Sequence, residues 1–406
     1  MPRYKYIARN KEGKAEESFQ DAQSQDELVG ILQARSLTVV TFKEATEETA
    51  KISSRKRRMH SGVKIDDLIT FSRQLSTLLG AGITLLRSLE IISLQIESKR
   101  LFDALEVVKK DVSAGNSLKA TLAKHPKVFS KLWVNIVETG ETTGQLPFAL
   151  EQLTTFLESS ATLTRKIKSA LVYPIVVLCV AAGAVTVFIV KIIPMFANIY
   201  SGFDASLPVF TDMVFTVCLG IKKYLLILVG LIVALVFGIR YYGKTHEGRK
   251  NIDKFKLSLP VFGDVIRQVA AVRFASGLNM LIKSGTPILH ALDIVIETSG
   301  NVIVTEMLQK VKENVREGKS MAEPLIKTGI FPDMLAHMVA VGEESGELAN
   351  MLENASKFYE ERVDATVSRM ATLFEPLLIV FIGAIVGTLV IAMFLPIFGL
   401  SGVIGG

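Results

Sequence analysis

The chain has 406 residues, of which 49% are hydrophobic and 21% are charged, and its mean hydropathy is +0.38. A soluble protein rarely averages so apolar, so we expect the apolar residues to be concentrated in membrane spans with charged domains between them. The net charge of +6 does not indicate nucleic-acid binding, because no predicted helix interleaves basic and aromatic residues and much of the basic excess lies beside apolar runs.

Cysteine and histidine usage argues against two further classes. Cys179 and Cys218 lie in apolar stretches, which disfavours a disulfide framework, and their spacing matches no metal-binding motif. The five histidines are scattered and form no paired-ligand pattern. The N-terminus has no apolar signal core, so we expect the first domain to stay on the side of synthesis.

Residues 1–43 are predicted to form a small α+β domain. Its expected elements are a strand at 4–8, a turn at 10–13, a short helix at 26–34 and a strand at 37–42. A segment of about 40 residues is too short for much independent stability, so we interpret it as an adaptor.

A polar linker at residues 44–62 follows, and it contains the basic run Arg55-Lys56-Arg57-Arg58. Two interpretations stay open for this run. It is either a solvated tether or a segment attracted to the anionic head groups of the cytoplasmic leaflet.

One unit occurs twice in the chain. The motif Gly140-Glu141-Thr142-Thr143-Gly144 returns as Gly342-Glu343-Glu344-Ser345-Gly346, and the numbers of the two first glycines differ by 202. The same offset aligns Leu150 with Leu352, Phe156 with Phe358, Pro174 with Pro376 and Pro194 with Pro396. One residue of slippage upstream aligns Phe71 with Phe274, Gly82 with Gly285 and Gly115 with Gly318. The fold must therefore contain the same unit twice.

Within each copy, apolar residues keep helical spacing, and short Gly or Ser joints separate the helices. The first helix starts at about Val63, and the last runs from about Pro147 into the basic segment 165–168. No convincing strand pattern interrupts the series. We therefore predict antiparallel helical bundles at residues 63–170 and 255–372.

Three apolar runs are candidates to cross the roughly 30 Å hydrocarbon core of a bilayer. The predicted spans are residues 171–196, 221–240 and 373–398, of which the second is short. The remaining predicted segments are a periplasmic loop at 197–220, a cytoplasmic linker at 241–254 and a periplasmic tail at 399–406. Lys191 lies near the far end of the first span, where it can extend to the head groups.

Basic residues orient these spans. Basic residues precede the first span, follow the second and precede the third. The positive-inside rule places all three of these basic flanks in the cytoplasm. Lys222 and Lys223 oppose this assignment but are outnumbered. The repeat supports the same topology. Two copies that each run from a cytoplasmic bundle into an outward span need one further span between them to return the chain to the cytoplasm. We expect a multi-pass membrane protein with its N-terminus in the cytoplasm and its C-terminus on the opposite side of the membrane.

No catalytic arrangement is found, and we expect no enzyme activity, cofactor or metal. Gly318-Lys319-Ser320 resembles the end of a phosphate-binding loop, but Glu313 stands where that loop needs glycine, so we interpret it as a helix stop and cap. Two carboxylate pairs could bind a hard cation between helices or be solvated helix ends, and we favour the second: Glu138 with Glu141, and Glu343 with Glu344.

The twin motif is the candidate functional site, through Gly140, Glu141, Gly144, Gly342, Glu343 and Gly346. Glycine permits a left-handed turn between helices, and the glutamate can cap the start of the following helix, which is sufficient to explain both copies. The functional alternative is a rigid, partner-facing surface. A second set of residues marks where the spans begin and end: Tyr173, Pro174, Pro194, Glu375, Pro376 and Pro396.

Taken together, these motifs resemble the polytopic platform family of type IV pilus assembly and type II secretion, known as PilC or GspF. The resemblance covers nearly the whole chain. It includes the N-terminal run at residues 4–8, the helix ends at Ala81-Gly82 and Ser284-Gly285, the twin motif, and residues 166–174 with Pro194. The second copy departs from the pattern by carrying Glu375 in the place of Tyr173.

The resemblance implies a non-enzymatic assembly platform that forms homo-oligomers in the bacterial inner membrane, with a periplasmic C-terminus. Its implied partners are a hexameric cytoplasmic ATPase, pilin or pseudopilin subunits, other inner-membrane assembly proteins and membrane lipid. It does not separate a pilus platform from a secretion or DNA-uptake platform. We hypothesise that the ATPase moves the two bundles and that helices continuous with the first and third spans transmit the movement.

A secondary transporter is the main alternative from another class, because parallel repeats also occur in transporters. The predicted spans carry no paired ionisable residues at mid-membrane depth, and three helices are few for a substrate path. A membrane enzyme is a weaker alternative, since no site was found.

Overall fold

The computed structural model describes residues 3–9, 15–21, 29–31, 38–44, 60–195, 198 and 209–404. The chain divides into two compact units. The first consists of residues 1–62 with 97–99, and the second consists of residues 63–96 with 100–406. The described part of the chain is mostly helical.

The first unit contains a three-stranded antiparallel sheet of order β2-β1-β3. Strands β1 (Arg3–Arg9) and β3 (Thr38–Glu44) match the two predicted strands. Strand β2 (Ala15–Asp21) was not predicted, because its sequence AEESFQD shows no apolar alternation, yet it pairs with β1 along its whole length. Residues 29–31 are helical; the predicted turn at 10–13, the rest of the predicted helix and most of the linker lie outside the described residues.

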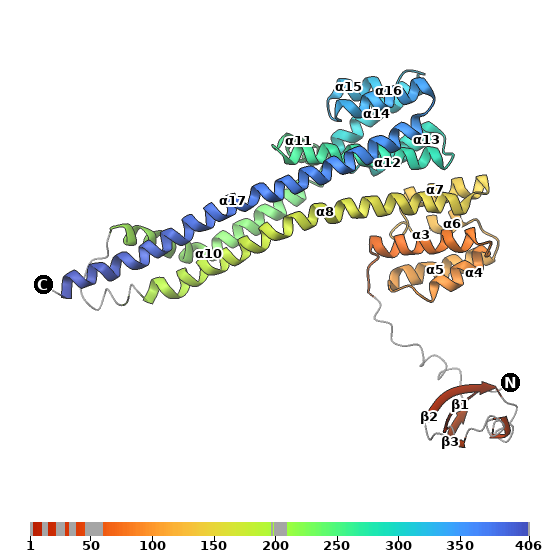
Figure 1. Cartoon of the computed structure of the whole chain (residues 1–406), viewed down its shortest axis with the longest axis horizontal. Helices are drawn as coiled ribbons and strands as arrows, with labels where there is room; N and C mark the ends of the chain where they lie inside the picture. The colour runs from red at the N-terminus through yellow and green to blue at the C-terminus, as the bar shows by residue number, and fades with distance from the viewer. Residues whose placement is uncertain are drawn as a thin grey trace. The chain divides into compact units, whose positions relative to one another are not determined.

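The second unit contains the same six-helix series twice (Figure 1). In the first copy, the helices are α3 (Ile65–Gly80), α4 (Leu85–Ser93), α5 (Lys99–Ser113), α6 (Leu118–Ala123), α7 (Lys131–Thr143) and α8 (Leu146–Val187). In the second copy, they are α12 (Phe262–Lys283), α13 (Ile288–Thr298), α14 (Val302–Arg316), α15 (Ala322–Thr328), α16 (Asp333–Ser345) and α17 (Leu348–Ile404). We call each series up to the start of its long last helix a bundle.

Equivalent aromatic side chains occupy the two bundle cores. In the first bundle, the buried rings of Phe71, Phe129 and Trp133 lie 5.4–5.9 Å apart. In the second, Phe274 and Phe331 stand at the positions of Phe71 and Phe129, with ring centroids 5.3 Å apart. The repeat seen in the sequence is therefore a repeat of core packing.

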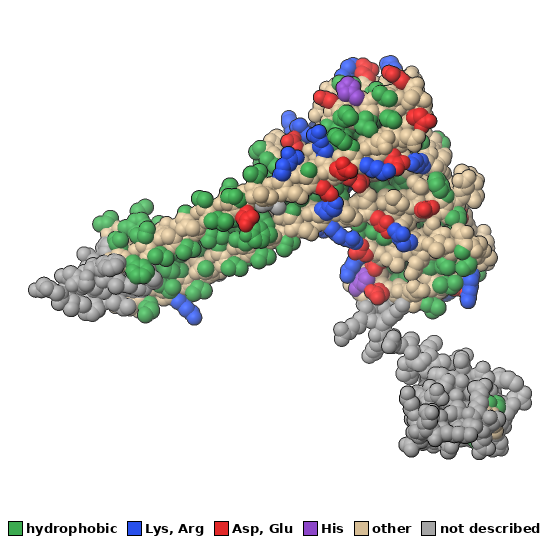
Figure 2. Space-filling model, viewed as in Figure 1, with side chains coloured by type: hydrophobic (Ala, Val, Ile, Leu, Met, Phe, Trp, Pro, Cys, Tyr) green, Lys and Arg blue, Asp and Glu red, His purple; other side chains and the backbone are tan. Residues whose placement is uncertain are grey.

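The last helix of each copy runs without a break from the bundle into the apolar segment. Helix α8 has 42 residues and continues through a π-helical turn, η1 (Phe188–Ile192), while α17 has 57 residues. Charged side chains gather on the bundles, and green apolar side chains cover the stalk formed by the long helices (Figure 2). The predicted spans 171–196 and 373–398 both lie largely within these helices.

Helix α10 (Val209–Tyr242) corrects the predicted loop at 197–220, which is wrong from Val209 onward. The charge of Asp212 favours a loop, but the other residues from Val209 to Gly220 are mainly apolar, and this stretch forms the first third of α10. The predicted linker at 241–254 is also wrong in part. Residues His246–Ser258 form helix α11, whose few apolar residues give no strong periodic signal.

Three helical segments are long and apolar enough to cross a membrane, within the residues described: Leu146–Met195, Phe262–Lys283 and Leu348–Ala392. The middle one is α12, and over half of its apolar window is buried inside the protein, so it is a core helix of the second bundle. The predicted span 221–240 lies in α10, where several side chains fall outside the described residues, and it stays a prediction.

Far from the bundles, the three long helices pack together. Phe188, Ile189 and Ile193 form an apolar cluster with Phe215 and Cys218 of α10. Leu389 of α17 packs against this cluster, and the Thr211 hydroxyl donates to the carbonyl of Ala392 over 3.3 Å. These contacts join α8, α10 and α17 into one stalk.

The two bundles also contact each other. Lys131 pairs with Glu297 at 2.8 Å, and Lys166 pairs with Asp364 between the two long helices. Between the bundles lies a cavity of about 160 Å³, whose lining includes Leu132 and Phe156 of the first copy and Phe274 and Leu308 of the second. Because exposed ion pairs contribute only about 0–1 kcal/mol each, the contact between the copies depends mainly on apolar packing, and the buried side chains of both copies belong to one continuous hydrophobic cluster.

Candidate functional site

The twin motif stands at the end of α7 and of α16, immediately before the two long helices. Gly144 and Gly346 end these helices with φ of 70° and 72°, in the left-handed region where a side chain is strained. Only Gln145 in the first copy and Glu347 in the second separate each glycine from the next helix. The predicted left-handed turn is present in both copies.

The first glycine of each motif allows two helices to touch. A Cβ on Gly140 would lie 2.9 Å from the Cβ of Ala149 and 3.0 Å from the Cα of Leu146. A Cβ on Gly342 would lie 2.9 Å from the Cα of Leu348 and 3.1 Å from the Cβ of Met351. The first turn of each long helix therefore packs directly on the backbone of the helix before it.

The glutamate of each motif caps a short helix of its own bundle. The N–H groups of Leu118 and Lys119, at the start of α6, donate to Glu141 over 2.6 and 2.9 Å. At the start of α15, the N–H group of Met321 and the hydroxyl of Ser320 donate to Glu343 over 2.8 and 2.6 Å. A carboxylate here satisfies N–H groups that have no partner within the helix and complements the helix dipole.

Our expectation that the glutamate caps the following helix was wrong. The carboxylate reaches back to a helix more than 20 residues earlier in the chain, because Glu141 and Glu343 lie within α7 and α16 on the side that meets the start of α6 or α15. The sequence marks the start of both short helices, since the aligned Gly115 and Gly318 each stand two residues before a serine, but it does not show that the glutamate reaches them. Ser117 accepts a hydrogen bond from Ala120, and Ser320 accepts one from Ala322, so Gly318-Lys319-Ser320 is a helix stop and cap.

Most residues of each motif therefore have a structural role. The exposed residues of the motif lie next to the glutamate that caps the short helix. Gly140 and Gly342 are buried and both glutamates are half-buried, whereas Thr142 and Glu344 are exposed. The two motifs form two separate local sites, since each glutamate binds within its own bundle.

The carboxylate pairs considered for a cation are engaged in other contacts. Glu138 pairs with Lys119, while Glu141 and Glu343 cap helices. Across the described ranges, no three His, Cys, Asp or Glu side chains gather closely enough to hold a metal ion.

The residues predicted to mark the spans lie in the long helices. In α8, Tyr173 is exposed and Pro174 is buried, and Pro194 is half-buried beyond η1. In α17, Glu375 and Pro376 are exposed, and Pro396 lies within the helix, but its side chain is outside the described residues. Proline has no N–H, so a backbone hydrogen bond is missing at the aligned positions Pro174 of α8 and Pro376 of α17.

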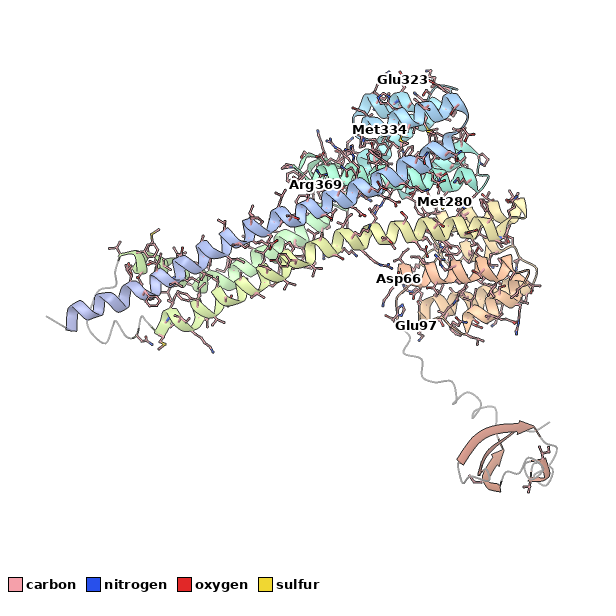
Figure 3. The ribbon with its side chains drawn as sticks, viewed as in Figure 1. Asp66, Glu97, Met280, Glu323, Met334 and Arg369 are labelled. Atoms are coloured by element: carbon pink, nitrogen blue, oxygen red, sulfur yellow. The ribbon has the colours of Figure 1, made fainter. Side chains whose placement is uncertain are left out.

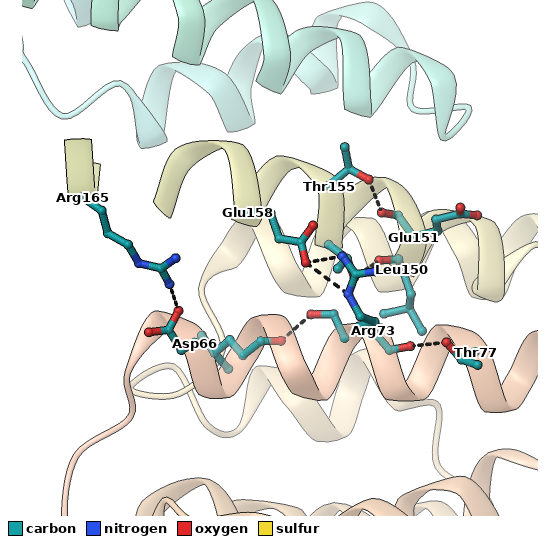
Figure 4. Close-up of polar contacts among 11 residues, drawn as sticks. Asp66, Arg73, Thr77, Leu150, Glu151, Thr155, Glu158 and Arg165 are labelled. Carbon is teal, nitrogen blue, oxygen red and sulfur yellow. Dashed lines mark hydrogen bonds and ion pairs between the residues drawn. The ribbon is translucent and has the colours of Figure 1, made fainter. Parts of the chain in front are cut away.

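Ion pairs join the first helix of the bundle to its long helix. Arg73 of α3 pairs with Glu158 of α8, and Asp66 pairs with Arg165 at the end of the bundle (Figure 4). These pairs are exposed and contribute little stability, but they fix which faces of α3 and α8 meet.

The second copy contains a charge network that sequence reasoning missed. Lys283 of α12 and Lys357 of α17 both donate to Glu353, and these hydrogen bonds lower the pKa of Glu353 to about 2. The aligned positions in the first copy are Gly80, Thr155 and Glu151. There the lysines are missing, and a groove of about 490 Å³ lies between α3 and α8.

The geometry defines a class of protein: a membrane protein with two copies of one helical bundle, each continued by its last helix into an apolar stalk. The model of the family "Type II secretion system (T2SS), protein F" matches residues 71–194 and 274–396, which are the two copies. The chain therefore belongs to this family, in which type IV pilus assembly proteins named PilC also fall.

Named relatives cover nearly the full chain. The chain is 39% identical over 403 residues to the type IV pilus assembly protein PilC of Thermus thermophilus, with 99% of each chain covered. It is 38% identical to PilC of Myxococcus xanthus, with 84% of this chain and 82% of the relative covered. It is 30% identical to the type II secretion system protein F of Pseudomonas aeruginosa, with 100% of each covered.

Proposed function

We propose that this chain is an inner-membrane platform protein for type IV pilus assembly, which couples a cytoplasmic assembly ATPase to insertion of pilin subunits into the filament. Relatives named PilC support this choice over type II secretion, because they match at 39%, 38% and 35% identity, against 30% and 29% for two relatives named protein F. A type II secretion platform is the second candidate, and pseudopilins would then be the subunits.

The observation that carries the proposal is the continuity of α8 and α17 from bundle to stalk. A continuous helix transmits displacement over its length, whereas a loop would absorb it. The twin motif fixes each long helix to its own bundle through the glycine contact. Because each long helix is fixed to a different bundle, an ATPase that shifts one bundle against the other would move α8 against α17 in the membrane.

The proposed topology has both bundles and the N-terminal segment in the cytoplasm. The first 43 residues form a small α+β adaptor domain, supported by the sheet β2-β1-β3. Helices α8, α10 and α17 span the membrane, residues 199–208 lie in the periplasmic connection, and the C-terminal tail is periplasmic. The protein works as a homo-oligomer without enzymatic activity of its own, together with other inner-membrane assembly proteins.

Site-specific crosslinking in cells tests the proposed partners. Photoreactive residues at Thr142 and Glu344 leave the caps intact because both side chains are exposed, whereas probes at Glu141 or Glu343 would remove them. We expect these probes to capture a cytoplasmic ATPase, and a probe at the exposed, apolar Val180 of α8 to capture a pilin. The proposal fails if neither protein is recovered and the purified chain instead moves a solute across a bilayer.

A further inference from the structure

Helix α11 lies between the stalk helix α10 and the second bundle, and among the described residues it has no counterpart in the first copy. One face of α11 is buried through Gly248, Asp253 and Leu257, and the Asp253 carboxylate accepts a hydrogen bond from the N–H of Val302 at the start of α14 over 3.1 Å. Lys254 and Phe255 are exposed, and Phe255, at 63% exposure, projects on the side away from Asp253 and Leu257. The helix therefore presents an aromatic ring and a lysine to its surroundings.

The connections at both ends hold α11 in place. A Cβ on Gly248 would lie 2.0 Å from the carbonyl oxygen of Tyr242, and one on Gly263 would lie 2.3 Å from that of Leu257. Between α11 and α12, Val261 has φ of 66° and ψ of −51°, and the N–H of Phe262 donates to the carbonyl of Pro260 over 2.7 Å. This is a γ-turn, a strained conformation for a β-branched residue, and it leaves Val261 and Phe262 exposed.

The corner after α11 lies at the level where the surface of the stalk changes from charged to apolar. The ring of Phe262 contacts that of Phe374 in α17, with centroids 6.5 Å apart. On α17, the charged Arg369 precedes this contact (Figure 3), and exposed apolar side chains follow from Leu373, with Glu375 as the last charge. If the stalk spans a bilayer, Phe262 and the corner lie at the head-group layer.

The chemistry of this corner fits a lipid surface. Tyr241 and Tyr242 at the end of α10 are exposed, as are Phe255 and Phe262, and aromatic rings are enriched at the membrane–water interface. Lys244 and Lys254 are exposed and form no ion pair with any described residue, whereas Lys250 pairs with Glu306 and Lys256 with Asp253.

Acidic groups near the corner do not cancel its charge. Residues 240–264 carry six Lys and Arg side chains against three acidic ones, Glu247, Asp253 and Asp264. Of these three, Asp253 is buried and engaged with Lys256 and Val302. Each cation near an anionic surface contributes about 1 kcal/mol to attraction.

We propose that the α11 corner, consisting of Tyr241, Tyr242, Lys244, Lys254, Phe255, Val261 and Phe262, lies in the head-group layer and binds anionic phospholipid. The proposal deepens the proposed function and rests on its membrane topology. The corner holds the second bundle at the membrane, and no described helix takes the equivalent place beside the first bundle. The ATPase would then move the first bundle against a second bundle that is anchored to lipid.

Depth-dependent fluorescence quenching of the full chain tests this proposal. A Phe255→Trp variant is reconstituted in phosphatidylcholine vesicles with and without phosphatidylglycerol, which contain nitroxide lipids labelled at the head group or in the middle of the acyl chain. The native Trp133 is buried in the first bundle and supplies a constant signal. We expect head-group nitroxide to quench the new tryptophan roughly twofold more than mid-chain nitroxide, and more strongly in anionic vesicles.

Two other positions calibrate the measurement. Val341→Trp is a matched control, since Val341 is exposed on the second bundle beside the start of α17, about 39 Å along that helix from Phe374. It should not be quenched by either lipid. Val180→Trp lies on the exposed apolar face of α8 and should be quenched by mid-chain nitroxide.

The outcomes separate the two proposals. If position 180 is not quenched, the membrane topology is wrong and both proposals fall. If position 180 is quenched but position 255 is not, only the lipid-binding corner is overturned. The double variant Lys244→Glu, Lys254→Glu should lose the difference between anionic and neutral vesicles; if the difference persists, the lysines do not bind lipid. If inorganic phosphate at matched ionic strength abolishes the quenching, the site takes free phosphate and the proposal is overturned.

Discussion

Replacing Gly140 or Gly342 by alanine is expected to destabilise the bundle that contains it by about 1–3 kcal/mol. The added Cβ would lie 2.9 Å from Ala149 in the first copy and 2.9 Å from the backbone of Leu348 in the second. In both copies the obstacle includes the backbone at the first turn of the long helix, which a rotamer change cannot move. The long helix must therefore move relative to its bundle. This change alters how movement of the bundle is transmitted to the stalk.

Each bundle has its own probe for this effect. Trp133 is the only tryptophan of the chain and lies in the core of the first bundle, so its fluorescence reports unfolding there for Gly140→Ala. Hydrogen exchange in α16 and the first turns of α17 reports on Gly342→Ala. The control is Gly80→Ala, because a Cβ at Gly80 has no neighbour within 4 Å. Equal midpoints for Gly140→Ala and Gly80→Ala would contradict the close helix contact.

Removing the glutamate of the motif should also cost about 1–3 kcal/mol, since Glu141→Ala leaves the N–H groups of Leu118 and Lys119 without their partner. Glu343→Ala leaves the N–H group of Met321 without its partner, while that of Ala322 keeps its hydrogen bond to Ser320, and the loss should begin with fraying of the short helix. Glutamine at either position should cost less, because its amide oxygen still accepts one hydrogen bond.

Amide exchange of α6 and α15 measures this loss directly. We expect exchange to accelerate in α6 for Glu141→Ala and in α15 for Glu343→Ala, with the other bundle unchanged. Glu344→Ala is the matched control, as this exposed side chain neighbours Glu343 and the structure shows it in no cap; its effect should stay within about 0.5 kcal/mol. Faster exchange in α16 or α17, with α15 unaffected, would show that the glutamate serves a different helix.

Local patterns in the sequence predict much of this architecture. The repeat, the helical series and the left-handed glycines after α7 and α16 follow from spacing within a few residues. The partner of Glu141 could not be predicted, because the contact with α6 depends on how the turn directs the chain back across the bundle. The network of Lys283, Glu353 and Lys357 is likewise formed by helices far apart in sequence and has no aligned lysines in the first copy.

The boundaries of helices and strands are predicted less well where polar residues interrupt an apolar pattern or where no such pattern is present. Strand β2 is polar throughout and is formed by backbone pairing with β1, which side-chain patterns do not reveal. Asp212 and the lysines of α11 favoured loops, but single charges do not end a helix whose other residues support it. Conversely, α12 is apolar enough to span a membrane but lies in a bundle, because the other helices of its repeat cover it.

The central claim is that α8 and α17 transmit bundle movement to the stalk, and breaking both helices tests it most directly. Glycine triplets at residues 169–171 and 371–373 weaken each helix by about 3 kcal/mol, just before the prolines Pro174 and Pro376 that already remove a hydrogen bond. Alanine triplets at the same positions are the control. We predict that the glycine variant keeps Trp133 fluorescence and crosslinking from Thr142 to the ATPase but assembles no filaments, while the alanine variant assembles them. Normal filament assembly by a glycine variant whose helices are shown to be broken would contradict the account.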